Sequence, residues 1–495
     1  MLTKDAYQLY INGEFCDAED GATMPAVNPY NESTWAHVPV ASTADVERAV
    51  LGARSAFDRE WSQAAPGIRA SLLIRLAELL EENAQELAVI ESTDNGKIIR
   101  ETQSQMHYSA RIFRYFAGYC DKHEGSVIPV DQKGLLDFTQ PVPYGVVAAI
   151  IAWNSPIVML ANKLGAALAA GNCCVLKPSE HASASSLAFA HLIHQAGFPA
   201  GVVNVVTGAA EVGKALVTAP GVDKVSFTGS PGVGAAIAAA VGATLRPISL
   251  ELGGKSANII FADADINAAV VGALAGIFGA SGQTCIAGSR LLVQRGVYDE
   301  VVGKLVERAK TIKMGNPLDP QTEMGCAANR VQFERILSMI NDAQGQGATL
   351  LTGGQAATGP GIDGGLFIEP TIFGNATNTM RLAREEIFGP VLAVIPFDTE
   401  EEAIAVANDS PYGLASGVWT QDLSKAMRMV SALHTGVVWV NTYRTSVPQA
   451  PFGGMKDSGF GRERGAEGLK EFLTTKNVMV DYSGDARDPF AMKFG

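Results

Sequence analysis

A cysteine surrounded by small residues is the first candidate for chemistry. Cys285 lies in residues 278–289, which read Phe-Gly-Ala-Ser-Gly-Gln-Thr-Cys-Ile-Ala-Gly-Ser. Glycines on both sides allow tight turns and close approach of a ligand to the backbone. Structural cysteines normally sit among large apolar neighbours. Taken alone, the stretch is compatible both with a nucleophilic thiol and with a structural one.

A carboxylate upstream favours the nucleophilic interpretation. Glu251 ends an apolar segment and is followed by Gly253 and Gly254. This arrangement is typical of a strand that delivers a side chain into a cleft. A thiol together with a candidate general base is the minimum set for covalent acyl chemistry.

Strands and helices that alternate along the chain must position these two residues. The expected strands are 146–152, 173–177, 202–206, 223–227 and 246–251, and the expected helices are 156–170, 183–196, 210–219 and 231–241. Apolar strands alternating with helices predict a parallel, doubly wound sheet. Ligands of such sheets bind beyond the carboxyl ends of the strands.

Polar residues follow three of these strands. They are Trp-Asn-Ser-Pro at 153–156, Lys-Pro-Ser-Glu at 177–180 and Phe-Thr-Gly-Ser-Pro-Gly-Val-Gly at 227–234. Gly229 and Gly234 open a helix whose backbone N–H groups either face a phosphate or form a tight packing turn. Lys177 and Glu180 either bind the two hydroxyls of a ribose or form a surface pair. Together the three strand ends predict a nucleotide cleft.

A second strand–helix series continues to about residue 450, with a helix at 297–312 and a strand at 391–395. Within it, residues 384–390 place a carboxylate and an aromatic ring before a Gly-Pro turn. Residues 451–463 are rich in glycine but include two phenylalanines, which favours a tightly folded loop over a linker.

An extended hairpin is expected at residues 125–144, between helical regions. It is interpreted as an arm that pairs with another subunit, or as an edge hairpin of its own domain. The tail contains a strand-like segment at 476–482. We expect that segment to pair with the 125–144 arm of a neighbouring subunit.

Composition excludes several classes of function. The 495 residues include 47% hydrophobic and 18% charged residues and carry a net charge of −13. This balance argues against a nucleic-acid or anionic-membrane surface. The six cysteines lack C-x-x-C spacing and the seven histidines are scattered. These patterns predict reduced thiols and no metal centre.

The ends and the hydropathy of the chain predict a cytoplasmic protein. The first residues are polar, unlike the apolar core of a signal peptide. The longest apolar run, 146–153, has eight residues, whereas a bilayer span needs roughly 18 to 20.

Six stretches, in order and spacing, make the chain similar to the aldehyde dehydrogenase superfamily. They are 177–180, 227–230, 250–257, 278–289, 386–390 and 451–454. The resemblance covers nearly the whole chain and indicates the hydrolytic, non-acylating branch. It implies an α/β fold with a Rossmann-type doubly wound cofactor domain, an α/β catalytic domain and a small β oligomerisation arm. The implied bounds are 1–124 and 145–252 with 457–470 returning for the cofactor domain, 253–456 for the catalytic domain, and 125–144 with 471–495 for the arm.

The resemblance also implies roles for the chemical groups. Cys285 would attack the aldehyde carbon, and the Asn154 side-chain amide with the Cys285 N–H would hold the oxyanion. After hydride transfer leaves a thioester, Glu251 would activate the water that hydrolyses it. Lys177 is assigned to both the catalytic and the cofactor-binding sets.

Cofactor residues follow from the same resemblance. They are Ile151, Trp153, Lys177, Ser179, Glu180, Gly208, Gly229, Ser230, Glu386 and Phe388. Trp153 and Phe388 are alternatively core aromatics. Glu180 would accept hydrogen bonds from a free 2′-hydroxyl, so NAD is expected, with NADP possible.

Where the family carries bulky aromatic residues, this chain has Ser155, Val158, Ala161, Gly279 and Ser446. The resemblance therefore implies a wide entrance, suited to a medium-chain, long-chain or aromatic aldehyde, and Phe452 joins this substrate set. Arg444 either meets an acid-tailed semialdehyde or forms a surface ion pair. Three alternatives to aldehyde oxidation to the free acid are a coenzyme A-acylating enzyme, a thiol esterase and a non-catalytic scaffold. Glu251 argues against the acylating enzyme. A homodimer or homotetramer is expected.

Overall fold

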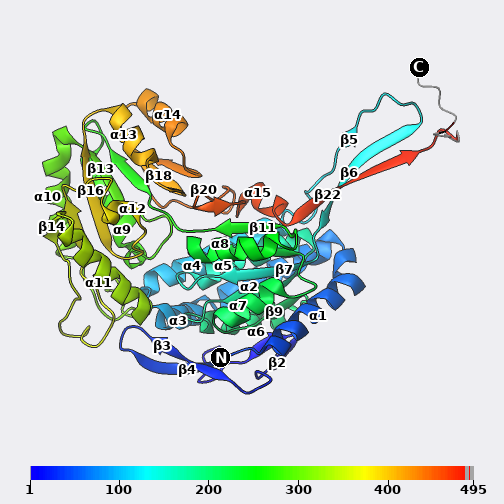
Figure 1. The fold of residues 1–495 in the computed structure, drawn as a ribbon. Coiled ribbons are helices and arrows are strands. Elements are labelled where there is room, and N and C mark those ends of the chain that lie inside the picture. Colours follow the sequence, from blue (N-terminus) through cyan, green and yellow to red (C-terminus); the bar gives the residue numbers. More distant parts are fainter. Residues whose placement is uncertain (1, 485–489, 491–495) are drawn as a thin grey trace.

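The computed structural model describes residues 2–484 and 490 and contains two large sheets, one beside the other, with a projecting arm (Figure 1). The first sheet runs in the order β2–β1–β9–β8–β7–β10–β11–β21, and its strands from β9 to β11 are parallel. Its strands are β1 (Leu9–Ile11), β2 (Glu14–Cys16), β7 (Val146–Ile151), β8 (Cys173–Pro178), β9 (Val203–Val205), β10 (Lys224–Thr228), β11 (Ile248–Glu251) and β21 (Gly459–Phe460). The predicted parallel, doubly wound sheet is therefore confirmed.

Helices cover both faces of this sheet. They are α1 (Thr43–Arg59), α2 (Pro66–Glu82), α3 (Ala84–Asn95), α4 (Ile99–Ala117), α5 (Pro156–Ala170), α6 (Ala184–Ala196), α7 (Ala210–Thr218) and α8 (Pro231–Gly242). α1, α7 and α8 pack on one face, while α5 and α6 pack on the other beneath α2, α3 and α4. Every residue of β7 and β8 is buried, as expected for parallel strands enclosed between helices.

The second sheet runs in the order β14–β15–β16–β13–β12–β18–β19 and is parallel except for β14. Its strands are β12 (Ala257–Ile260), β13 (Arg290–Gln294), β14 (Thr349–Thr352), β15 (Thr371–Gly374), β16 (Val391–Phe397), β18 (Ala415–Trp419) and β19 (Val437–Val440). Its helices are α9 (Ile266–Phe278), α10 (Tyr298–Ala309), α11 (Arg330–Gly345), α12 (Arg381–Arg384), α13 (Glu400–Asn408) and α14 (Leu423–Ala432). The apolar runs of β12, β13 and β16 form its buried centre.

The glycine-rich stretch 451–463 is folded, as its phenylalanines predicted. It contributes β20 (Met455–Lys456), which pairs with β17 (Tyr412–Gly413), and then β21, which pairs with β11 at the edge of the first sheet. α15 (Gly465–Lys470) follows and packs against α5. A chain that left the first sheet after β11 thus returns to it.

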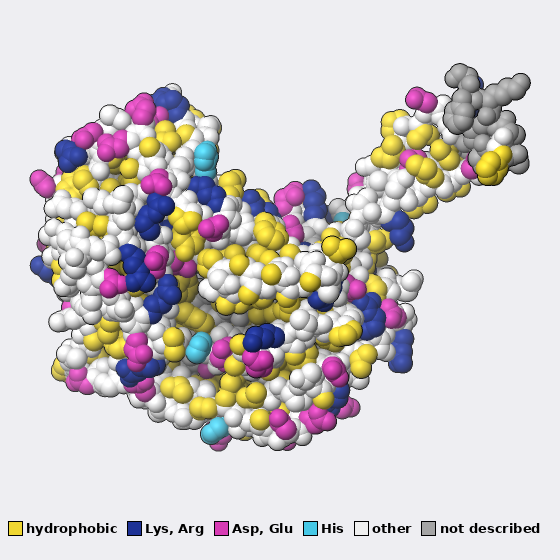
Figure 2. All heavy atoms as spheres, viewed as in Figure 1, with side chains coloured by type: hydrophobic (Ala, Val, Ile, Leu, Met, Phe, Trp, Pro, Cys, Tyr) yellow, Lys and Arg dark blue, Asp and Glu magenta, His cyan; other side chains and the backbone are white. Residues whose placement is uncertain are grey.

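The arm consists of β5 (Val127–Ile128), β6 (Leu135–Pro143) and β22 (Leu473–Asp481), all antiparallel. The expected hairpin is confirmed. The tail strand, however, pairs with β6 of its own chain along nine residue pairs, and our prediction that it pairs with a neighbouring subunit was wrong. Alternating side chains give no information on which copy supplies the partner strand. Hydrophobic side chains gather on the surface of this arm (Figure 2).

A separate ribbon of β3 (Thr23–Asn28) and β4 (Ser33–Pro39) completes the fold. Within residues 2–484 and 490, no helix is both long and apolar enough to cross a bilayer.

Candidate functional site

A cleft of about 1060 Å³ is lined by residues of both large sheets. It brings together thirteen of the positions singled out in the sequence, namely Trp153, Asn154, Ser155, Val158, Gly229, Ser230, Glu251, Cys285, Glu386, Phe388, Arg444, Ser446 and Phe452. Residues from the ends of β7, β10 and β11 therefore meet those of the second sheet.

Other predicted positions lie outside the lining of this cleft. They are Ile151, Ala161, Lys177, Ser179, Glu180, Gly208 and Gly279. Lys177 is on β8 beside Ile150 of β7, so it shares the carboxyl edge of the sheet. Its ammonium donates to the Pro178 carbonyl at 3.0 Å and lies 3.9 Å from the Glu180 carboxylate.

The Gly279 position is filled by a neighbouring side chain. A methyl group added at Gly279 would overlap the Arg444 guanidinium. The small residue therefore admits an arginine, where we had expected it to widen the entrance. Arg444 donates to the Ala275 carbonyl at 3.0 Å, and its nearest carboxylate is Glu101, at 3.9 Å.

The loop of Cys285 has an irregular but well-bonded path. Ala280 and Ser281 have left-handed φ values of 53° and 54°, a conformation that is uncommon in residues other than glycine. The Ala280 N–H donates to Glu101 at 3.0 Å, and the Ser281 hydroxyl donates to the Gly325 carbonyl at 3.0 Å. The loop leaves the Cys285 thiol half-buried on the wall of the cleft.

The Cys285 thiol is not a free thiolate in this environment. Burial raises its pKa to about 12, and the nearby Glu386 and Glu251 carboxylates add to the shift. Because the thiolate is the reactive form, a base must take the proton as the sulfur attacks.

Glu251 is a buried carboxylate without a hydrogen-bond partner among the described residues. It ends β11 and lines the cleft. Burial raises its pKa well above the usual range, and the Glu463 carboxylate pushes it further in that direction. A carboxylate with a raised pKa and open lone pairs is suited to accept a proton from water or a thiol.

Behind Glu251 lies a buried ion pair. The Lys163 ammonium is 2.7 Å from a Glu463 oxygen and donates to the Ser226 hydroxyl at 3.0 Å. The second Glu463 oxygen accepts a bond from the Asn162 amide at 2.9 Å. Both Glu463 oxygens and the Lys163 ammonium thus have hydrogen-bond partners within the wall.

Asn154 presents an amide donor on the cleft wall. Its Nδ2 donates to the Gln283 carbonyl at 2.9 Å, which ties it to the Cys285 loop. An amide carries two N–H groups, so one N–H remains for a substrate oxygen.

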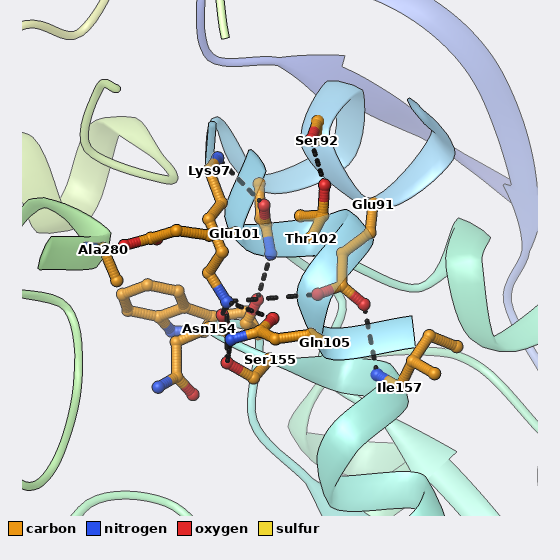
Figure 3. A network of polar contacts seen from close by, with 12 residues as sticks. Glu91, Ser92, Lys97, Glu101, Thr102, Gln105, Asn154, Ser155, Ile157 and Ala280 are labelled. Carbon is orange, nitrogen blue, oxygen red and sulfur yellow. Dashed lines mark hydrogen bonds and ion pairs between the residues drawn. The ribbon is translucent and has the colours of Figure 1, made fainter. Parts of the chain in front are cut away.

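A lysine fixes the backbone that carries this amide (Figure 3). The Lys97 ammonium donates to the Asn154 carbonyl, to the Ser155 hydroxyl at 2.7 Å and to Gln105 at 3.0 Å. Glu91 lies 4.0 Å from the same ammonium and accepts a bond from the Ile157 N–H at 3.1 Å. Burial lowers the pKa of Lys97 and raises that of Glu91. α3, α4 and the turn between them therefore hold the end of β7.

The opposite wall fits a dinucleotide. α8 begins directly after β10 with Ser230 as its N-cap and Pro231 in its first turn, so its free N–H groups open at the cleft. The buried Thr228 hydroxyl beside them has no partner in the described structure. Trp153 and Phe388 meet edge to face with ring centroids 5.2 Å apart, and both line the cleft.

Glu386 is held on this wall by the glycines after β11. One of its oxygens accepts the Gly254 N–H at 3.0 Å, and a methyl group at Gly253 would overlap its carboxylate. Burial raises the pKa of Glu386 to about 7. Within the described part of the chain, no three His, Cys, Asp or Glu side chains gather to hold a metal ion.

Sequence reasoning missed four side chains of this site: Lys97, Lys163, Glu463 and Arg464. Lys97 follows an Asn-Gly pair at a helix end, and Glu463 and Arg464 close the glycine-rich stretch. Lys97, Glu463 and Arg464 gave only signals of turns, whereas Lys163 lies within the expected helix 156–170. A charged residue beside a turn is usually solvated, so the pattern carried no sign of burial.

Comparisons with known proteins agree with this geometry. A model of the aldehyde dehydrogenase family matches residues 15–478. A (Z)-2-((N-methylformamido)methylene)-5-hydroxybutyrolactone dehydrogenase of Acinetobacter baylyi is 48% identical, over 98% of this chain and 99% of that protein. A "Putative aldehyde dehydrogenase DhaS" of Bacillus subtilis is 42% identical, over 96% and 95%.

Solved structures agree as well. Betaine aldehyde dehydrogenase of Staphylococcus aureus in complex with NAD+ superposes with a TM-score of 0.96 at 39% identity, over 98% of this chain and 97% of that one. PnpE from Pseudomonas sp. WBC-3 gives a TM-score of 0.96 at 43% identity, over 98% and 99%. By its sequence, its fold and the matched family model, this chain belongs to the aldehyde dehydrogenase family.

Proposed function

We propose that the protein oxidises an aldehyde to a carboxylic acid with NAD, through a thioester on Cys285. One observation carries the proposal: Glu251, buried and without a hydrogen-bond partner among the described residues, lines the same cleft as the half-buried Cys285 thiol. Burying a carboxyl group without hydrogen bonds is costly, and ionisable groups held in such surroundings cluster at functional sites.

The residues of the cleft account for the first step. Glu251 accepts the thiol proton, directly or through a water, while the sulfur bonds to the aldehyde carbon. The electron pair of the carbonyl moves to its oxygen, where the free N–H of Asn154 and the backbone N–H of Cys285 stabilise it. Each such donor contributes on the order of 3 kcal/mol to lowering the barrier.

NAD, when bound, supplies the acceptor for the hydride that leaves the reacting carbon. The N-terminus of α8 and Ser230 would hold the pyrophosphate, Glu386 the nicotinamide ribose, and Trp153 with Phe388 the ring. Lys177 and Glu180 would hold the adenosine ribose. We infer a preference for NAD over NADP because a carboxylate at Glu180 repels a 2′-phosphate.

Glu251 completes the reaction. Once the thioester has formed and Glu251 has released the thiol proton to solvent, its carboxylate takes a proton from water, the hydroxide bonds to the acyl carbon and the C–S bond breaks. Glu251 returns this proton to the departing sulfur, so the acid leaves and the thiol is restored. A carboxylate poised for this step favours hydrolysis over transfer to coenzyme A.

The substrate is proposed to be a medium-chain, long-chain or aromatic aldehyde. Ser155, Val158 and Ser446 are small residues of the cleft wall, and the cleft volume of about 1060 Å³ has room for substrate beside a dinucleotide. A cytoplasmic location stays a prediction of the sequence.

Absorbance of the reduced nicotinamide tests the proposal. Purified protein is mixed with NAD or NADP and with aldehydes from acetaldehyde to long-chain and aromatic ones, beside a Cys285→Ala variant. Turnover with NAD that vanishes in the variant is expected. Absence of reduced cofactor with every aldehyde contradicts the proposal. Turnover that needs coenzyme A would show that the enzyme catalyses the acylating reaction.

We further propose a homodimer or homotetramer that uses the arm. Val127, Met479 and Tyr482 on the arm are 73%, 62% and 70% exposed, and exposed apolar clusters of this kind mark association surfaces. Mass measurement under native conditions tests this assembly. A fully active monomer contradicts it.

A further inference from the structure

The charges that line the cleft are unevenly distributed. The charged residues among its described lining are Glu251, Glu386, Glu463, Arg335, Arg444 and Arg464. Arg335 donates to the backbone carbonyl of Glu386 on the cofactor wall. Glu463 is bonded to Lys163. Arg444 and Arg464 are therefore the cations left for the remaining wall, where Ser446 and Phe452 also lie.

Arg464 lies close to two aromatic rings. Its guanidinium carbon is 4.6 Å from the centre of the Phe452 ring and 5.5 Å from that of Tyr108. Its Nη1 donates to the Ser446 hydroxyl, and its Nε lies 3.4 Å from the Asn162 amide oxygen. The two rings attract the guanidinium at these distances without using its N–H groups, which stay available for hydrogen bonds.

No carboxylate neutralises this arginine by an ion pair in the described part of the chain. Two of its five N–H groups are engaged by the hydroxyl and the amide oxygen, and three remain. Its positive charge lowers the pKa of both Cys285 and Glu251, so its field reaches the reacting groups. Arg444 adds a second charge, because its one carboxylate neighbour is 3.9 Å away and is shared with the Ala280 N–H.

We propose that Arg464, with Arg444 on the lining of the same cleft, binds a carboxylate at the far end of the substrate, so that the natural substrate is an aldehyde acid. The planar guanidinium fork matches a carboxylate in two parallel hydrogen bonds. The rings of Tyr108, Phe452 and Trp439 on the same wall suit a flat apolar body between the two functional groups. This inference rests on the proposed aldehyde oxidation and narrows its substrate class.

Matched substrates separate the charge from the size of the aldehyde. We would measure kcat/KM for 4-carboxybenzaldehyde and 4-methylbenzaldehyde, and for succinic semialdehyde and butanal, with NAD. The native enzyme is expected to prefer the acid in at least one pair by about tenfold or more, and Arg464→Gln to lower that preference about 10- to 100-fold. Most of the change should appear in KM. The KM for the acid alone should rise with ionic strength.

Three further variants keep the test decisive. Arg464→Lys retains the charge and should recover part of the preference, whereas a purely structural loss would remain. Arg444→Gln measures the share of the second arginine. Arg428→Gln, an exposed arginine paired with Glu400, should leave the preference unchanged.

The outcomes distinguish the two proposals. Oxidation of neutral aldehydes with no preference for the acid, or with a preference that Arg464→Gln leaves intact, overturns the carboxylate site alone. Failure to reduce NAD with any of the four aldehydes overturns the proposed function and this inference with it.

Discussion

Two buried lysine–carboxylate pairs stand behind the cleft, one behind Asn154 and one behind Glu251. Lys97 and Glu91 are 4.0 Å apart, whereas Lys163 and Glu463 are 2.7 Å apart. In the Lys97–Glu91 pair, the hydrogen bonds of the lysine go to the cleft wall, since Lys97 donates to the Asn154 carbonyl and to Ser155. The tighter pair bonds to itself and to Ser226 and Asn162.

This difference separates two kinds of catalytic group. A donor that stabilises a developing charge must be fixed before the reaction, and the loop of Asn154 is fixed from behind by a charged group. A base that accepts and releases protons needs open lone pairs, and Glu251 has two carboxylate oxygens without partners in the described part of the chain. The backbone of Asn154 is held by the hydrogen bonds of Lys97, whereas the Glu251 carboxylate is left open.

The largest effect is expected from removing the Glu251 carboxylate. Glu251→Gln keeps the shape but loses the base, so steady-state turnover should fall by about 10²- to 10⁴-fold. Stopped-flow absorbance should show a burst of reduced cofactor, because thioester hydrolysis is the step that slows most. Glu334→Gln, an exposed site on α11, serves as control. Turnover within twofold of the native rate would exclude Glu251 as the base.

The next largest effect is expected from breaking the Lys97–Glu91 pair. Lys97→Met leaves Glu91 buried and unpaired, which should cost about 3 to 5 kcal/mol of stability and lower the thermal midpoint at a fixed scan rate. The double variant Lys97→Met/Glu91→Leu should recover much of that loss, because it removes both charges. It should not recover kcat, since the Asn154 carbonyl still lacks its donor. Full recovery of kcat in the double variant would show that Lys97 does not position Asn154.

The thermal midpoint measured over a series of pH values tests the raised pKa of Glu251. Because the pKa of Glu251 is raised in the folded protein, the folded chain holds more protons than the unfolded chain between the ordinary and the raised pKa. Its contribution to the free energy of unfolding therefore falls as pH rises, by about 1.4 kcal/mol per pH unit in that window. Glu251→Gln should exceed the native thermal midpoint at pH 8, and its advantage should shrink toward pH 5. An advantage independent of pH would contradict the shifted pKa.

The smallest effect is expected from removing one hydrogen bond of Lys97. Ser155→Ala removes one acceptor from Lys97, which keeps Asn154 and Gln105 as partners. We expect a loss of about 1 kcal/mol, visible as a small drop in thermal midpoint. Ser71→Ala, which removes an exposed hydroxyl bonded to the Gly67 carbonyl, is the matched control. A loss as large as that of Lys97→Met would mean that Ser155 carries most of the network.

The contrast also marks how far the sequence could be interpreted. β7, β8 and β11 were predictable because each is an apolar run that ends in polar or glycine residues, and Glu251 stood at such an end. The role of Lys97 was not, because its partners Asn154 and Ser155 lie 57 and 58 residues away in sequence. Contacts of that separation depend on how α4 packs against α5, which the hydrophobic period of either helix leaves undetermined.

The prediction that Gly279 widens the entrance and the prediction for the tail strand failed for a related reason. The sequence showed an arginine in a loop and a strand-like tail, but not which space or which strand would receive them. Gly279 offers the space for Arg444, and β6 offers the edge for β22. Both are complementary surfaces that exist only once the rest of the chain has folded.

The irregular loop that carries Cys285 has a consequence for motion. Apart from the bonds of Ala280 and Ser281, the Gln283 side chain donates to the Cys326 carbonyl at 3.2 Å and accepts the Ala328 N–H at 2.9 Å. A segment tied in this way opens only when the surrounding structure opens with it. The bonded N–H groups of Ala280 and Gln283 should therefore exchange with heavy water as slowly as those of a core strand, and the sulfur is held in one position.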